Sequence, residues 1–126
     1  MPELDDHALA RSLAEEAGRL LLEVRAELVA SGATGKELGA EGDRRSHELL
    51  MARLAAERPD DAVLSEEGAG SEGPSGTTRL SSSRVWIIDP LDGTREYGED
   101  PRPDWAVHVA LVVDGEPVAG IRECRT

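Results

Sequence analysis

Two carboxylates between Trp86 and Thr94 have the residue type and spacing suited to metal chemistry. Asp89 follows a short apolar run, and Asp92 comes three residues later. The intervening Pro90 fixes φ and has no N–H for a sheet hydrogen bond, so we expect the chain to turn here and bring the two carboxylates together. Mg²⁺ prefers oxygen ligands and commonly leaves room in its shell for a substrate phosphate.

The Gly93-Thr94 pair that follows the carboxylates is suited to holding a phosphate. Glycine lets the backbone approach a ligand closely, and a threonine hydroxyl lies beside the unpaired N–H groups of any helical turn that begins there. The stretch therefore indicates magnesium-assisted phosphate transfer. Taken alone, Asp89 and Asp92 are equally consistent with a turn in which an aspartate caps the next helix.

Two helices are expected to support this stretch. Leucine, alanine and valine residues at spacings of three and four predict an amphipathic helix from about Asp5 to Leu28. The glycine-containing segment 31–42 is expected to be a loop or a weak hairpin. A second helix is then predicted from Asp43, as a plausible N-cap, to Arg58, and we expect His47 on this helix to be solvated.

Four short runs predict strands, at residues 61–65, 84–88, 105–113 and 116–121. If the first two lie side by side, Glu66 and Asp89 emerge at the same edge of the sheet and form a carboxylate cluster with Asp92. In the third strand, His108 falls on the face opposite Trp105. We expect His108 to be a half-buried sheet residue rather than a catalytic base.

Composition limits the classes of function. The chain of 126 residues has the length of one small domain and a formal net charge of −12, which argues against binding a nucleic acid polymer. A single cysteine permits no internal disulfide. No apolar run is long enough for a signal peptide or a membrane span, so we expect a cytoplasmic protein without a membrane partner.

The order of these motifs resembles a known family. Leu64-Ser65-Glu66-Glu67, a Gly/Ser-rich excursion and then Val85 to Thr94 resemble the magnesium-dependent, lithium-sensitive phosphatase superfamily that includes inositol monophosphatase. Arg95-Glu96-Tyr97 is more similar to its 3′(2′),5′-bisphosphate nucleotidase (CysQ-type) branch. The resemblance implies an α/β (α+β layered), sugar-phosphatase-like fold. We expect its N-terminal half, with two helices packed on a mostly antiparallel sheet.

The resemblance also implies the metal ligands. Glu66 resembles the ligand of a first metal that helps to orient the attacking water. Asp89 resembles the carboxylate that bridges two metals, the Leu91 carbonyl a backbone ligand, and Asp92 a ligand of the second metal. The implied cofactor is Mg²⁺, as two or three ions, with inhibition by Li⁺.

Three further residues take roles from the resemblance. Gly93 and Thr94 resemble the phosphate-binding amides, and the Thr94 hydroxyl is implied to lie near the nucleophilic water. Asp43 stands where the family has an aspartate that supports a third, activating metal. The threonine usual three residues earlier is Ala40 here, which departs from the pattern.

The implied activity is hydrolysis of a phosphate monoester of adenosine 3′,5′-bisphosphate or a sulfated analogue. Inositol monophosphate or fructose 1,6-bisphosphate hydrolysis is the alternative within the enzyme class, and a truncated, catalytically inactive remnant is the alternative outside it. We expect residues 1–120 to be the N-terminal metal- and phosphate-binding portion and 121–126 a divergent tail, with the family's C-terminal domain absent. The expected partner is a small phosphorylated substrate. A homodimer is a further alternative that the sequence does not decide.

Overall fold

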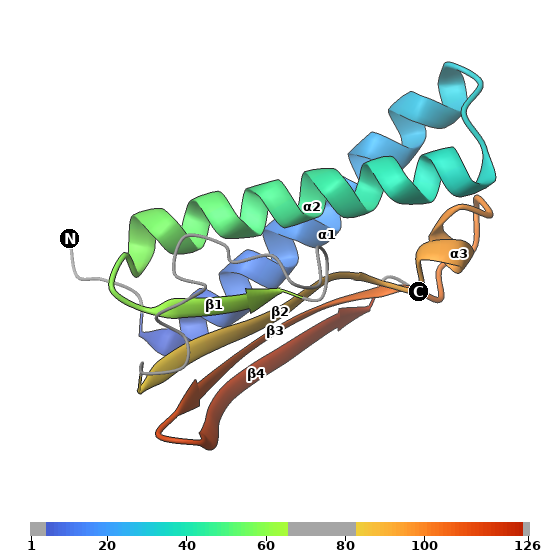
Figure 1. Ribbon diagram of the computed structural model, residues 1–126. Helices are drawn as coiled ribbons and strands as arrows, with labels where there is room; N and C mark the ends of the chain where they lie inside the picture. Colours follow the sequence, from blue (N-terminus) through green and yellow to red (C-terminus); the bar gives the residue numbers. More distant parts are fainter. Residues whose placement is uncertain (1–4, 66–82, 125–126) are drawn as a thin grey trace.

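The structure, a computed structural model, describes residues 5–65 and 83–124. The elements in chain order are α1 (Asp6–Ala30), α2 (Gly35–Glu57), β1 (Ala62–Ser65), β2 (Arg84–Asp92), α3 (Thr94–Tyr97), β3 (Ala106–Val113) and β4 (Glu116–Cys124). The two long helices lie on the same side of the sheet (Figure 1). α1 packs mainly on β3 and β4, and α2 packs mainly on β2. This confirms the predicted layer arrangement.

The sheet has the strand order β1-β2-β3-β4. β1 and β2 are parallel, whereas β2, β3 and β4 form antiparallel pairs. The sheet is thus mixed and mostly antiparallel, as predicted. The predicted neighbourhood of the first two strands is confirmed as well, because Ser65 at the end of β1 pairs with Ile88, the residue before Asp89.

α1 begins where the sequence predicts. Asp5 has extended backbone dihedrals and is the N-cap, and its side chain accepts a hydrogen bond of 2.7 Å from the backbone N–H of Ala8. Leu9, Leu13 and Leu21 of this helix are fully buried at the predicted spacing.

α2 begins eight residues before the predicted start, at Gly35 instead of Asp43. Residues 35–42 of the glycine-containing segment are therefore helical, whereas 31–34 form a turn between the two helices as expected, and Asp43 lies inside α2 rather than at its N-cap. Glycine disfavours a helix by only about 1 kcal/mol relative to alanine, which tertiary packing readily offsets. Gly39 and Gly42 are buried on the side of α2 that contacts α3.

Two strands are longer than predicted. β2 does not end before Asp89 but continues to Asp92, and β4 continues past Ile121 to Cys124. In β4 the strand is maintained by pairing with β3, where Arg122 lies opposite His108. Apolar alternation, on which the prediction rested, is absent from this end of β4 and is not required for backbone pairing.

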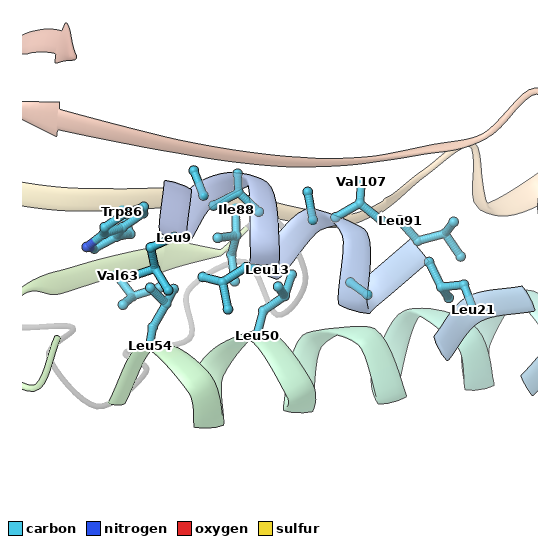
Figure 2. Close-up of a cluster of buried hydrophobic side chains, with 14 of the residues drawn as sticks. Leu9, Leu13, Leu21, Leu50, Leu54, Val63, Trp86, Ile88, Leu91 and Val107 are labelled. Atoms are coloured by element: carbon cyan, nitrogen blue, oxygen red, sulfur yellow. The ribbon is translucent and has the colours of Figure 1, made fainter. Parts of the chain in front are cut away.

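The core fills the space between the helices and the sheet. Figure 2 shows buried side chains from both layers, including Leu9, Leu13 and Leu21 of α1, Leu50 and Leu54 of α2, Val63 of β1, Trp86, Ile88 and Leu91 of β2, and Val107 of β3. Burying a leucine or valine side chain stabilises the fold by about 1.5–3 kcal/mol. Within residues 5–65 and 83–124, no helix has both the length and the apolar character needed to cross a bilayer.

Candidate metal and phosphate site

A β-bulge in β2 brings Asp89 and Asp92 to the same face of the sheet. Asp89 pairs with His108 of β3 and Asp92 pairs with Ala106, so three steps along β2 match two steps along β3. Side chains alternate between the faces of a regular strand, and residues three apart would point to opposite sides. The one extra residue of the bulge compensates for this odd spacing, so both aspartates lie on the face opposite the helices. The predicted convergence thus arises from a bulge within a strand, not from a turn that ends it.

The two carboxylates lie close to the imidazole of His108. Potential ligand atoms of Asp89, Asp92 and His108 all lie within 4.8 Å of one another. His108 Nε2 is 2.9 Å from Asp92 Oδ2, and the backbone N–H of Leu91 donates to Asp89 Oδ1 at 3.3 Å. Asp92 is exposed, while Asp89 and His108 are half-buried. Two carboxylates within reach of one point, open to solvent, fit the oxygen-rich shell that Mg²⁺ requires.

The chain leaves the bulge through Gly93, which has a φ of +89° and so occupies the left-handed region that favours glycine. The single turn of α3 follows directly. The Thr94 hydroxyl donates to the Leu91 carbonyl at 3.3 Å, which ties the first residue of α3 to the bulge. The predicted Gly-Thr pair therefore stands at the start of a helical turn, beside the two carboxylates.

α2 contacts both the bulge and α3. The Ser46 hydroxyl, which is fully buried, donates to the Pro90 carbonyl at 2.8 Å. A Cβ on Gly39 would lie 2.8 Å from Thr94 Cγ2, and a Cβ on Gly42 would lie 2.5 Å from the Tyr97 ring. These two glycines let the helix axis approach α3 more closely than any other residue would permit.

A cleft of about 640 Å³ lies between the start of α2 and α3. It is lined by Asp43 and Thr94 together with Gly35, Lys36, Gly39, Ala40, Arg95 and Glu99. The Asp43 carboxylate is half-buried, and its Oδ1 atom is shielded from solvent. The structure thus brings Asp43, whose N-cap role it rejects, to the same cleft as Thr94.

The other side of α3 is anchored by Arg25 of α1. Its buried guanidinium donates to the carbonyls of Tyr97 at 3.1 Å and of Arg102 at 2.9 Å, and pairs with Asp100 at 3.3 Å. The guanidinium carbon lies 5.1 Å from the centre of the Tyr97 ring and 5.5 Å from that of Trp105, within cation–π range. One side chain therefore joins α1 to the segment between α3 and β3.

Tyr97 is buried at the centre of these contacts. Its hydroxyl donates to the Leu21 carbonyl at 2.6 Å, and its ring packs edge-on against Trp105 with ring centres 5.2 Å apart. Burial raises the pKa of Tyr97 to about 12, because the phenolate would lose its hydration, although the Arg25 charge opposes the shift. Tyr97 therefore anchors α3 and is not exposed to solvent in the cleft.

Glu66, predicted to hold a metal, lies outside the described residues. The residue before it, Ser65, accepts or donates a hydrogen bond of 2.9 Å with His47 Nδ1 of α2. His47 is half-buried and not simply solvated as expected. This contact links α2 to the end of β1, where Ser65 pairs with Ile88, the residue before Asp89.

Sequence reasoning missed the contacts of Ser46, His108 and Arg25 with the site. The alternation in β3 placed His108 on the face opposite Trp105, but its distance from Asp92 depends on the bulge register. Ser46 and Arg25 carry no local signal, because each bonds a backbone carbonyl more than 40 residues away along the chain.

Comparison with known proteins agrees with this arrangement. A profile described as the inositol monophosphatase family matches residues 5–124, which is nearly the whole chain. The chain belongs to the inositol monophosphatase family. Within this family, a Mycobacterium leprae protein named 3′-phosphoadenosine 5′-phosphate phosphatase is 54% identical over 109 residues, covering 86% of this chain and 38% of that protein. An inositol-1-monophosphatase of the same organism is 37% identical, covering 95% of the chain and 45% of that protein.

A solved protein structure shows the same architecture. Mycobacterium tuberculosis SuhB superposes with a TM-score of 0.70 at 30% identity, over 92% of this chain and 38% of that one. The sugar-phosphatase-like fold predicted from the motifs is thereby confirmed. The chain spans about two fifths of the length of these relatives.

Proposed function

We propose that this chain carries the metal- and phosphate-binding portion of a magnesium-dependent phosphatase that hydrolyses a phosphate monoester with water. The observation that carries the proposal is the bulge, which sets Asp89 and Asp92 on one face beside Thr94. A turn in which an aspartate caps the next helix does not need the two carboxylates to converge, and neither does a regular strand without a bulge. The name of the M. leprae relative, 3′-phosphoadenosine 5′-phosphate phosphatase, supports adenosine 3′,5′-bisphosphate as substrate.

Asp89, Asp92 and the Leu91 carbonyl are the groups that would hold Mg²⁺. When bound, Mg²⁺ supplies a water of lowered pKa and neutralises charge on the phosphoryl group. The donor set fits, because carboxylate oxygens of Asp89 and Asp92 are grouped at a position open to solvent. Glu66, which follows Ser65 in the chain, is proposed as a further ligand that orients the attacking water, and Asp43 as the residue that supports an activating ion.

Thr94 is suited to orienting the attacking water. Its hydroxyl has one proton, which it donates to the Leu91 carbonyl. The oxygen lone pairs are left to accept a hydrogen bond from a water molecule, so the hydroxyl can fix the direction of that water. The backbone amides of Gly93 and Thr94 are proposed to hold the phosphate oxygens next to it. No side chain of the described residues needs to act as a covalent nucleophile.

The test is phosphate release from adenosine 3′,5′-bisphosphate by the chain, measured with Mg²⁺ and after chelation. We expect release that depends on Mg²⁺ and that falls at least about 10- to 100-fold in Asp89→Asn. The variant loses the negative charge and one of the two oxygens of a ligand, and removing even a partner of a ligand costs this much. Asp114→Asn is the matched control, since Asp114 lies in the exposed β3–β4 turn with a φ of 51° that asparagine tolerates.

Two results would refute the proposal. One is release that survives both chelation and Asp89→Asn. The other is a folded wild-type chain that releases no phosphate from any tested substrate, which would support the inactive alternative. Inositol 1-phosphate and fructose 1,6-bisphosphate should be tested in the same assay. Faster phosphate release from either compound would identify it, rather than the nucleotide, as the preferred substrate. The relative named inositol-1-monophosphatase makes the first of these the runner-up.

A further inference from the structure

His108 is a polar side chain at the site to which the family resemblance gives no role. It lies opposite Asp89 in the β2–β3 ladder and two residues from the partner of Asp92. Directly opposite residues of an antiparallel pair extend to the same face. The imidazole therefore projects from β3 over the bulge, where its Nε2 reaches Asp92 Oδ2 at 2.9 Å.

We propose that His108 is the positioning residue for Asp92: its Nε2–H donates to one carboxylate oxygen and so orients the other toward the metal. This inference rests on the proposed function, because it assigns Asp92 as a ligand. An ionised carboxylate only accepts hydrogen bonds, so the proton between these two atoms belongs to the imidazole. A protonated Nε2 has no lone pair for a metal, and His108 thus acts through Asp92 and not as a ligand.

Asp92 needs such a partner more than Asp89 does. Its side chain is 53% exposed, whereas that of His108 is 35% exposed. The Asp89 carboxylate is already held by the Leu91 N–H. An exposed aspartate loses rotamer freedom when it binds a metal, and Mg²⁺ tolerates little departure from octahedral geometry. A hydrogen bond that selects the binding rotamer beforehand lowers this entropic penalty.

The β2–β3 register explains why the His108 side chain reaches Asp92 although Asp89 is the residue directly opposite it. In a regular ladder, His108 would face only Asp89, and the next β2 side chain on that face would be two residues along the strand. The bulge places Asp92 at this next position, opposite Ala106. The small Ala106 side chain leaves the space beside Asp92 to the imidazole. Bulge, alanine and histidine together determine the orientation of this carboxylate.

The test is Mg²⁺ affinity, measured by calorimetric titration of the whole chain without substrate. We expect His108→Ala to weaken Mg²⁺ binding about 10- to 100-fold, the usual effect of removing a partner of a metal ligand. His108→Gln should retain affinity near wild type, because its amide N–H can occupy the place of Nε2–H. The control is His7→Ala on the exposed start of α1, which should leave affinity unchanged.

A thermal-shift titration with Mg²⁺ and steady-state kinetics complete the experiment. With His108→Ala, the Mg²⁺ concentration for half-maximal rate should rise while kcat at saturating Mg²⁺ changes little. Unchanged Mg²⁺ affinity in His108→Ala would overturn the proposal, as would a His108→Gln variant as weak as His108→Ala, which would indicate direct ligation. Mg²⁺ binding by a wild-type chain that releases no phosphate would refute the proposed function alone, since the affinity comparison needs no turnover.

Discussion

Gly39 of α2 and Thr94 of α3 are in contact so close that a single added methyl group would clash with the backbone. A Cβ built on Gly39 would lie 2.8 Å from Thr94 Cγ2 and 2.9 Å from the Thr94 carbonyl oxygen. Real Cβ atoms essentially never approach other atoms so closely. The position of the proposed water-orienting hydroxyl is thus set by the absence of a side chain on the neighbouring helix.

Gly39→Ala should destabilise the chain although alanine is the better helix former. Helix propensity alone would stabilise by about 1 kcal/mol, but overpacking against the Thr94 carbonyl is expected to cost about 1–3 kcal/mol. Urea unfolding gives the net change, and phosphate release should fall as Thr94 shifts. Glu37→Ala, at an exposed position in the first turn of α2, is the control. A Gly39→Ala variant as stable as that control would contradict the contact.

Arg25→Met should loosen α3. The change leaves two carbonyls, those of Tyr97 and Arg102, without their charged donor, and hydrogen bonds to charged groups contribute about 1.5–3 kcal/mol each. We expect an unfolding free energy lower by about 2–4 kcal/mol, since part of the loss is relieved by relaxation. Arg25→Lys should recover only part, because one ammonium cannot reproduce the planar fork. Arg19→Met, exposed on the same helix, should change stability by less than about 0.5 kcal/mol.

Tyr97 should titrate well above the ordinary range. It is the only tyrosine of the chain, so the ultraviolet absorbance of tyrosinate reports this residue alone. Burial raises its pKa to about 12, and we expect the folded chain to show a midpoint near that value. In urea the midpoint should return to about 10. A midpoint near 10 in the folded chain would show that the hydroxyl is not buried.

The same shift predicts how stability changes in alkali. A group whose pKa is raised on folding contributes stability that is complete below the unfolded pKa and is lost as the pH rises through the folded pKa. The contribution of Tyr97 should therefore be lost between about pH 10 and 12, by about 1.4 kcal/mol per pH unit at most. Tyr97→Phe should be less stable at neutral pH, because the hydrogen bond to Leu21 is gone, but should lack this alkaline loss.

Asp6 should support stability until the pH becomes strongly acidic. Its Oδ1 accepts hydrogen bonds from Arg84 at 2.8 Å and from Arg58 at 3.2 Å. The Arg84 hydrogen bond is the main reason that the pKa of Asp6 lies below its usual value. A lowered folded pKa gives stability that is present above the unfolded pKa, about 4, and is lost as the pH falls through the folded value.

Urea unfolding of Asp6→Asn over a pH series checks this expectation. The variant should be less stable than wild type by about 1 kcal/mol at neutral pH, a modest figure because the pair is partly exposed. The difference should shrink as the pH falls below about 4. Asp60→Asn, at an exposed position after α2, should show no such convergence. A constant difference across the series would indicate that packing, and not charge, explains the effect.

Much of the fold follows from local patterns. The spacing of leucines predicted α1, and short apolar runs predicted the four strands. The start of α2 was missed because the glycines that argue against a helix locally are required by the approach of α3, a contact between distant segments. Local propensity carries no information about that approach.

The sequence predicted which residues of the site meet, but not the backbone geometry that brings them together; their role as a metal and phosphate site stays a prediction. Asp89, Asp92 and Thr94 were identified from residue type and order, and the structure brings these three together. The contact of His108 could not be predicted, since it depends on which β3 residue lies opposite the bulge. A register is a property of two strands, and one strand's sequence does not specify it.

The bulge also explains how two aspartates three residues apart can face the same point. Each residue along a regular strand reverses the side to which the next side chain points, so by parity alone Asp89 and Asp92 would lie on opposite sides. The extra residue of the bulge cancels this reversal, because three steps along β2 match two steps along β3. Straightening β2 into a regular strand of the same length would therefore turn Asp92 toward the helices and the apolar interior, so the convergence of the two carboxylates depends on the bulge and not on their spacing alone.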